Sequence, residues 1–301
     1  MLFEALERRL LLSADAIAIT AIEVNDGNPQ RSTVSTITVE FDRDVQAVPP
    51  QILFLRNTST GTGVDTARAQ VSYDAASHRA TWRFPAEIGG TLANGNYLGA
   101  ILSEEVQAQT DFTLDGNRDG QTGDSHVFQF HRQSGDADGD RDTDFSDLFK
   151  FRSTFQKAGT DTGFDARFDF DADGDVDFAD LFGFRRAFDT ALAPDPVVTA
   201  GLSRDTARNG AFNSDALTSD ATIAGMLTER AAVATLEAGF DQTFVDVSGK
   251  LLPDGNFTLS PTDLKVIAGG TLIDGHHVLT LQAKNAAGGL LSFVDVAFVL
   301  D

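Results

Sequence analysis

An acidic segment that occurs twice, 33 residues apart, constrains the fold of this chain more than any other feature of its sequence. The first copy begins at Asp136 and reads DADGDRDTDFSDLFKFRSTF, and the second begins at Asp169 and reads DFDADGDVDFADLFGFRRAF. Both copies have aspartate at positions 1, 3, 5, 7, 9 and 12. The aspartates are Asp136, Asp138, Asp140, Asp142, Asp144 and Asp147, then Asp169, Asp171, Asp173, Asp175, Asp177 and Asp180. Any fold of this segment must hold many negative charges close together.

Two calcium ions, one for each copy, are the expected counter-charge for these carboxylates. Like charges at this spacing repel strongly, so a folded loop needs a cation at its centre. The spacing is that of a twelve-residue calcium loop, and magnesium fits less well because it requires a tight octahedron. A solvated acidic linker would not repeat its apolar residues at the same offset. Those residues are Leu148, Phe149, Phe151 and Phe155, which recur as Leu181, Phe182, Phe184 and Phe188.

Each loop is expected to have a helix after it but none before it. The preceding segments, HVFQFHRQSG and GTDTGFDARF, show no helical stripe, whereas an EF-hand has helices on both sides of its loop. A duplicated loop with only an exit helix resembles the type I dockerin, a calcium-dependent module that binds cohesin domains. The resemblance covers residues 135–190. It implies a paired F-hand fold and a cohesin-like protein, or another surface protein, as partner.

Position 6 of the loop differs between the two copies. A calcium loop turns sharply there and favours glycine, which Gly174 provides, but the first copy has Arg141. A side chain in the left-handed conformation costs about 1–2 kcal/mol. We therefore expect the first site to bind calcium more weakly than the second.

The aromatic residues of the repeat divide between a core and a partner face. Positions 13, 16 and 20 lie on one helical stripe and are expected to fill the core of the module. Positions 10 and 14 form a second pair, one turn apart. In dockerins, positions 10, 11, 17 and 18 face the cohesin. The resemblance and the aromatic pairs together give a partner face of Phe145, Ser146, Phe149, Arg152 and Ser153, with Phe178, Ala179, Phe182, Arg185 and Arg186. Alternatively, one aromatic pair packs against a neighbouring domain.

Short β-rich segments separated by turns fill the chain on both sides of the repeat. Residues 17–132, which include VNDGNPQRSTVSTITVEF, resemble bacterial Ig-like modules found ahead of dockerins, and residues 198–301 resemble Ig-like repeats of surface proteins. Residues 191–197 are expected to form a stiff, proline-containing linker. The sequence thus predicts a mostly β protein in which two Ig-like β-sandwiches flank a small α-helical dockerin module.

The N-terminal segment FEALERRLLLSAD resembles the LEPR-XLL motif of planctomycete surface proteins, with Arg8 where that motif has proline. This resemblance implies a targeting segment over residues 1–16. The net charge of −22 argues against binding to nucleic acid or to an anionic membrane. No apolar run is long enough to span a membrane, and the chain has no cysteine. Since weak calcium modules suit millimolar calcium, we expect an extracellular or cell-surface location.

A third cation is a further possibility in the loop LDGNRDGQTGD, through Asp115, Asn117, Asp119 and Asp124, although an acidic turn explains these residues equally well. No nucleophile, phosphate-binding or zinc-protease motif is present, so we expect no enzyme. The preferred function is a non-catalytic docking protein with sandwiches as spacers or adhesion modules. The alternative is the accessory carbohydrate-binding part of a polysaccharide-degrading system. One Trp and two Tyr make few sugar-binding platforms and favour the first reading.

Overall fold

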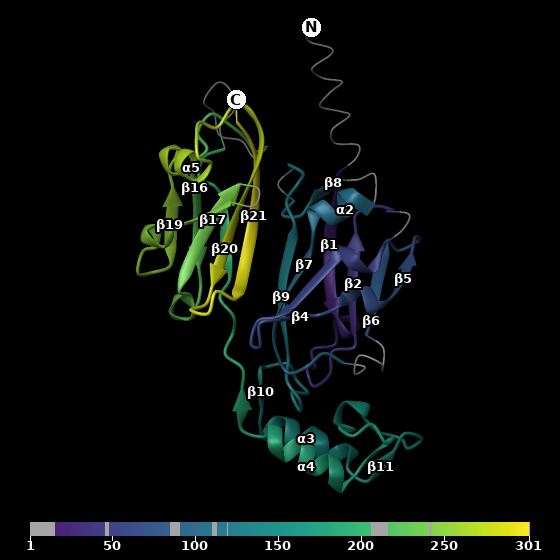
Figure 1. Ribbon diagram of the computed structural model, residues 1–301. Helices are drawn as coiled ribbons and strands as arrows, with labels where there is room; N and C mark the ends of the chain where they lie inside the picture. Colours follow the sequence, from purple (N-terminus) through teal and green to yellow (C-terminus); the bar gives the residue numbers. More distant parts are fainter. Residues whose placement is uncertain are drawn as a thin grey trace.

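The computed structural model describes residues 16–45, 48–84, 91–109, 113–118, 120–205, 216–240 and 243–300. The expected targeting segment lies outside these ranges except for Ala16. Within the described residues, no helix is long and apolar enough to cross a membrane. Two β-sheet regions and one small helical module make up the chain, which confirms the predicted fold class (Figure 1).

The N-terminal region is a sandwich of two sheets. The five-stranded sheet has the order β5 (Gln70–Asp74), β6 (Arg79–Arg83), β2 (Thr36–Phe41), β1 (Ala16–Val24), β8 (Thr113–Asp115). The four-stranded sheet has the order β4 (Thr62–Gly63), β3 (Leu53–Asn57), β7 (Gly95–Ile101), β9 (His126–Arg132). Helix α2 (Ser103–Gln109) follows β7. Trp82 of β6 is fully buried between the sheets and donates its indole N–H to the carbonyl of Pro50 at 3.0 Å, so it belongs to the core.

The C-terminal region repeats this architecture with different strand pairing. Its smaller sheet has the order β14 (Val198–Leu202), β16 (Ile223–Leu227), β19 (Asn256–Leu259). Its larger sheet has the order β15 (Leu217–Thr218), β21 (Leu290–Leu300), β20 (Gly275–Lys284), β17 (Thr235–Phe240), β18 (Thr243–Asp246). Helix α5 (Pro261–Ile267) begins at a capping box between Ser260 and Asp263, which satisfies backbone N–H groups at the helix start.

The helical module between them contains α3 (Phe145–Thr154) and α4 (Phe178–Ala187), packed side by side. Strand β10 (Asp142–Thr143) of the first loop pairs with β13 (Thr190–Ala191), which follows the second helix. Strand β12 (Asp175–Val176) of the second loop pairs with β11 (Lys157–Ala158), which follows the first helix. Each copy is therefore completed by the other, and the module has an approximate two-fold symmetry that the repeat alone does not specify.

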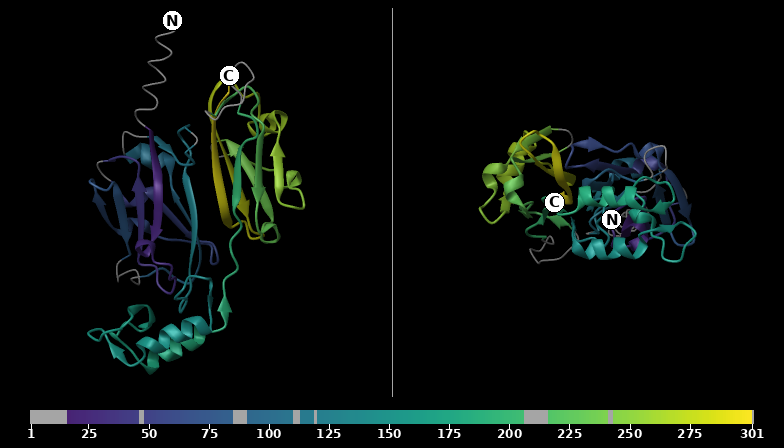
Figure 2. Two further views of the ribbon diagram at one scale, coloured as in Figure 1. Left: turned by 180° about the vertical axis from the view of Figure 1, so that it is seen from behind. Right: turned by 90° about the horizontal axis from the view of Figure 1, so that it is seen from below.

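The sandwiches lie side by side and the helical module lies at one end of the pair (Figure 2). Leu98 and Ala100 of β7 are buried against Phe293 of β21. The alternate residues of β7, such as Tyr97 and Ile101, point into the core of their own sandwich, so the whole strand is buried. The sandwiches flank the module in sequence, but in space they contact each other directly.

Residues 191–197 run along the first sandwich. The Asn96 side chain donates to the carbonyl of Ala193 at 2.7 Å, and the Gln129 side chain donates to the carbonyl of Pro196 at 2.8 Å. Asp195 accepts hydrogen bonds from Thr58 and Asn96. These contacts fix the segment more firmly than its prolines alone would do.

Candidate calcium centres

The backbone of each acidic loop turns at two left-handed residues, at positions 4 and 6. In the first loop these are Gly139 and Arg141, with φ of 86° and 80°, and in the second they are Ala172 and Gly174, with φ of 60° and 96°. Arg141 thus has the strained conformation that its position in the repeat predicts. Each loop has glycine at only one of its two left-handed positions, and the two loops differ in which one.

The first and last aspartates organise each loop through backbone N–H groups. Asp136 accepts hydrogen bonds from the N–H groups of Gly139 and Arg141, at 2.5 and 3.2 Å. Asp147 accepts from the N–H groups of Ala137 and Asp144, at 2.7 and 2.9 Å. Because Asp147 also closes a capping box with Asp144, the end of the loop and the start of α3 are one structure.

The second loop has similar bonds, except that its first aspartate accepts from positions 5 and 6 and not from positions 4 and 6. Asp169 accepts from the N–H groups of Asp173 and Gly174, at 3.2 and 3.0 Å. Asp180 accepts from those of Phe170 and Asp177, at 2.6 and 2.8 Å, and Asp177 caps α4. Both loops therefore fold around a buried final aspartate.

The carboxylates of each loop form two triads. The triads are Asp136, Asp138 and Asp147; Asp142, Asp144 and Asp147; Asp169, Asp171 and Asp180; Asp175, Asp177 and Asp180. Within each triad the oxygens lie within 4.8 Å of one another. Of the predicted ligands, Asp140 and Asp173 lie outside the triads and accept the N–H of the residue at position 7, at 3.2 and 3.1 Å.

These clusters fit a hard divalent cation. One oxygen each of Asp138, Asp142 and Asp175 is buried without a hydrogen-bond partner, which is costly unless an ion binds it. Burial and neighbouring carboxylates raise the pKa of Asp147 to about 6, and they also raise the pKa values of Asp142, Asp171 and Asp175. Oxygen-only ligands at this density suit calcium. If present, the ion would neutralise the clustered charge and cross-link each loop to its exit helix.

Basic side chains surround the first loop, and they have no counterparts at the equivalent positions of the second. His131 Nε2 lies 2.7 Å from a carboxylate oxygen of Asp136, and Lys150 Nζ lies 3.1 Å from one of Asp138. Arg141 donates to the side-chain oxygen of Asn96 at 2.8 Å. The residue equivalent to Lys150 in the second copy is Gly183, and the ring of Phe170 packs against it. This asymmetry agrees with a weaker first site.

Sequence reasoning missed the role of His131. The residue belongs to β9 of the first sandwich and is five residues from Asp136, with nothing in the local pattern that marks it. The contact of Lys150 with the loop could have been expected from its spacing, because Lys150 follows Asp147 by three residues and so lies on the same side of the helix.

The first loop is docked on the first sandwich. The N–H of Arg31 donates to the carbonyl of Asp136 at 2.9 Å, and the hydroxyl of Ser32 accepts from the N–H of Gly135 at 3.0 Å. A Cβ on Gly139 would lie 2.0 Å from the carbonyl oxygen of Pro29, whereas nothing lies within 4 Å of such an atom on Gly174. The turn at Gly174 in the second loop is therefore open, whereas the turn at Gly139 in the first loop is covered.

The expected third cation site is a turn in the described residues. Both oxygens of the buried Asp124 accept backbone N–H groups, from Gly116 and Asn117 at 3.0 Å each. Asp115 accepts the N–H of Gly120 at 3.0 Å. Described residues form no cluster of three ligands there, and Asp119 lies outside them, so this site stays a prediction.

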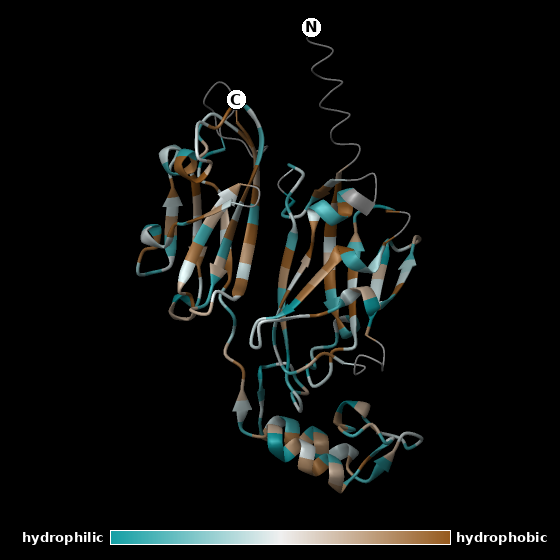
Figure 3. Ribbon diagram, viewed as in Figure 1, coloured by the Kyte–Doolittle hydropathy of each residue, from teal (hydrophilic) through white to brown (hydrophobic). Residues whose placement is uncertain are grey.

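The residues of the expected partner face are all exposed. Phe145, Phe149, Phe178 and Phe182, on α3 and α4, are between 59% and 67% exposed. Hydrophobic and hydrophilic residues alternate along the ribbon of the helical module (Figure 3). Ser146, Arg152, Ser153, Ala179, Arg185 and Arg186 are exposed as well. Phe151, Phe168 and Phe184 are buried between the helices, with Leu148, Phe155, Leu181 and Phe188 packed against them. The alternative, in which one aromatic pair packs against a neighbouring sandwich, is wrong because all four rings are exposed.

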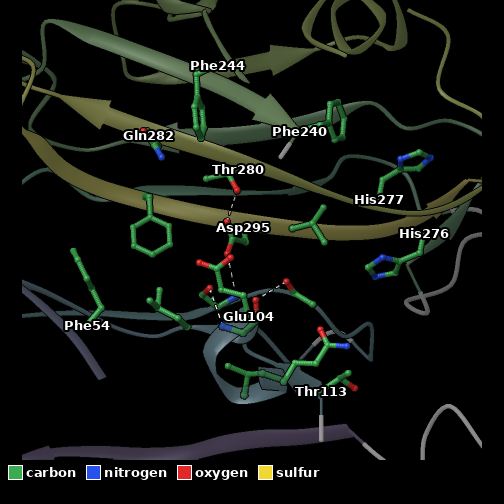
Figure 4. A pocket seen from close by; sticks show the side chains of 18 of the residues that line it. Phe54, Glu104, Thr113, Phe240, Phe244, His276, His277, Thr280, Gln282 and Asp295 are labelled. Carbon is green, nitrogen blue, oxygen red and sulfur yellow. Dashed lines mark hydrogen bonds between the residues drawn. The ribbon is translucent and has the colours of Figure 1, made fainter. Parts of the chain in front are cut away.

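A cavity of about 890 Å³ lies between the two sandwiches (Figure 4). Phe240, Phe244 and Phe293 supply aromatic surface, and the acidic residues Glu104 and Asp295 also line the cavity. The Asp295 oxygens accept from the Ser125 N–H at 3.1 Å and from the Thr280 hydroxyl at 2.6 Å. Since the carboxylate already joins the two sandwiches, it serves to hold the interface together.

Comparison with known proteins leaves the family open. No protein-family model matches the chain, and no curated protein matches it. A type II cohesin–X-dockerin complex from Acetivibrio cellulolyticus aligns with 49% of this chain and 89% of its own, at 10% identity and a TM-score of 0.20. Fibronectin(III)-like modules of Clostridium thermocellum CbhA align over 93% of this chain and 94% of theirs, at 8% identity and a TM-score of 0.23. Identities and TM-scores this low do not place the chain in either family.

Proposed function

We propose that this chain is a non-catalytic, calcium-binding protein of the cell surface or extracellular space, whose helical module docks onto a cohesin-like or other surface protein. The four exposed phenylalanines on α3 and α4 carry this proposal. Contiguous exposed apolar surface on a folded protein usually marks a binding site. Each helix carries two of these rings one turn apart, and its first turn is built from an acidic loop, so calcium would order the surface that the partner contacts.

The composition of the face supports a protein partner. Arg152 and Arg185 lie at the same position of the two copies, beside the exposed rings. Aromatic residues and arginine are enriched at the centres of protein interfaces. The Phe145 ring packs edge-on against Phe188, with centroids 5.2 Å apart, and the Phe178 ring packs in the same way against Phe155. Two of the four exposed rings, Phe145 and Phe178, are thus held in place before a partner binds.

The two sandwiches are proposed to act as spacers or adhesion modules, with unit boundaries at 17–132, 135–190 and 198–301. Three separate clusters of buried apolar residues support this division, one for each unit. The carbohydrate-binding alternative has less support, because Trp82 and Tyr97 are fully buried and offer no platform for a sugar ring.

A capture experiment with the full chain tests this function. The immobilised protein is mixed with cohesin domains or with extracellular protein of the source cells, in calcium and in chelator. We expect capture in calcium only, and we expect the double substitution Phe149→Ser and Phe182→Ser to abolish it. Val266→Ser is the matched control, since Val266 is equally exposed but lies on α5. Capture that persists in the double variant would contradict the proposed face.

A further inference from the structure

A second cavity, of about 410 Å³, lies where the first sandwich meets the second calcium loop. Three arginines line it, each from a different element: Arg132 from β9, Arg167 from the segment before the loop, and Arg186 from α4. Asn94 and Ser134 add polar side chains, and Phe170 adds an aromatic wall. The three arginines gather positive charge at one cavity of a chain whose net charge is −22.

The positive charge of this cavity is only partly compensated within the described residues. Arg167 pairs with Asp165, at 2.7 and 3.0 Å from its Nε to the two carboxylate oxygens. Arg132 donates from one terminal nitrogen to the neutral amide oxygen of Asn94, and its buried Nε–H has no partner. Neither Arg132 nor Arg186 forms an ion pair with any residue that the structure describes. Burial lowers the pKa of Arg132 to about 10, so the side chain stays charged at neutral pH.

We propose that this cavity binds an oxyanion, the carboxylate or sulfate group of a small acidic molecule such as an acidic sugar. A guanidinium presents its N–H groups in a planar fork that matches an oxyanion, and the arginines that line this cavity offer such forks. The hydroxyl of Ser134 and the ring of Phe170 lie beside these donors, where a sugar offers both polar and apolar faces. Cavities of this size hold small molecules.

Calcium in the second loop would favour the anion. Asp169, the first ligand position of that loop, also lines the cavity. Its free carboxylate repels an incoming oxyanion, whereas a calcium ion on the same carboxylate removes this repulsion. The binding experiment therefore uses the full chain saturated with calcium. The inference does not depend on the docking function, because the cavity is formed between the module and its own sandwich.

Calorimetric titration with glucuronate, a glucose sulfate and neutral glucose, at constant ionic strength, tests the proposal. We expect both acidic sugars to bind and glucose not to bind, and the stronger of the two identifies the carboxylate or sulfate source. Arg132→Gln and Arg186→Gln should each weaken binding about tenfold or more, since each removes a charged hydrogen-bond donor.

Arg185→Gln is the control, because Arg185 precedes Arg186 on α4 and changes the net charge equally but does not line the cavity. It should leave affinity within about twofold, as expected for screened charges. Equal losses in the Arg185 and Arg186 variants, or no binding of either acidic sugar, would overturn the proposal. If Arg132→Gln does not fold, the exposed Arg186 decides the test, and unchanged affinity in its variant refutes the site.

Discussion

Phe151 and Phe184 occupy the same position in the two copies of the repeat, and their rings contact each other at the centre of the helical module, with centroids 5.0 Å apart. The same two-fold relation matches the Phe145–Phe188 contact with the Phe178–Phe155 contact. The two acidic loops are therefore joined through one shared aromatic core. A change at this contact should affect both loops, whereas a change at the exposed Phe149 should affect neither.

Phe151→Ala should destabilise the helical module by about 3–5 kcal/mol, because it removes a fully buried ring from a core with few other members. The measurement is urea unfolding of the full chain in calcium, followed by the helical circular dichroism signal. Phe149→Ala, on the exposed side of the same helix, should change stability by less than about 0.5 kcal/mol. Equal effects of the two substitutions would contradict the assigned core.

Removing calcium should unfold α3 and α4 while the sandwiches keep their sheets. Without a cation the clustered carboxylates repel one another, and metal binding supplies much of the folding free energy of such small sites. Far-UV circular dichroism of the full chain before and after chelation measures this change. A helical signal that chelator leaves unchanged would show that the module folds on its aromatic core alone.

Calcium affinity should fall as the pH drops below about 6. In the absence of metal the pKa of Asp147 is raised from 3.8 to about 6 by burial, so protons compete with calcium for this carboxylate in that range. The raised pKa also stabilises the metal-free fold below pH 3.8, and this stability is lost as the pH rises through about 6. Calcium titrations between about pH 5 and 7 measure the first effect. A pH-independent affinity would contradict the role of Asp147.

Arg141→Gly should tighten the weaker calcium site by up to about tenfold, because glycine adopts the left-handed turn without strain of roughly 1–2 kcal/mol. The side chain also donates to Asn96, so the substitution removes a contact with the sandwich. Arg141→Ala is the control, since it loses the same contact and keeps the strain. Calorimetry that shows the same affinity for both variants would attribute the weak site to something other than position 6.

Gly139→Ala should disrupt the docking of the first loop more than Gly174→Ala disrupts the second loop. Both residues are left-handed, so each substitution costs about 1 kcal/mol in the backbone. At Gly139 the new Cβ would also lie 2.0 Å from the carbonyl oxygen of Pro29, while at Gly174 it meets nothing within 4 Å. Thermal unfolding in calcium compares the two variants, and equal losses would argue against the docked arrangement.

Much of the fold and of the carboxylate clusters could be predicted from sequence, because both depend on the spacing of residues that are close in the chain. The aspartates act within one twelve-residue loop, and the capping boxes that start α3 and α4 use residues three apart. Alternation along strands such as β1 and β6 follows from one buried face. Position 6 of the first loop could be identified as strained because only the backbone turn matters there, and Arg141 has positive φ.

The sequence by itself determined the repeat, the acidic loops, the buried stripe of each exit helix and the β-rich character of both flanking regions, because these depend on contacts between residues close in the chain. Only the tertiary structure determined how the two copies of the repeat pair with each other, through β10 with β13 and β12 with β11. The tertiary structure also brings His131 into contact with Asp136 and the carbonyl of Pro29 close to Gly139. These contacts cover the turn of the first loop, whereas the turn at Gly174 in the second loop is open. Such contacts cannot be predicted from the local sequence around either residue, because the packing of whole units against each other determines them.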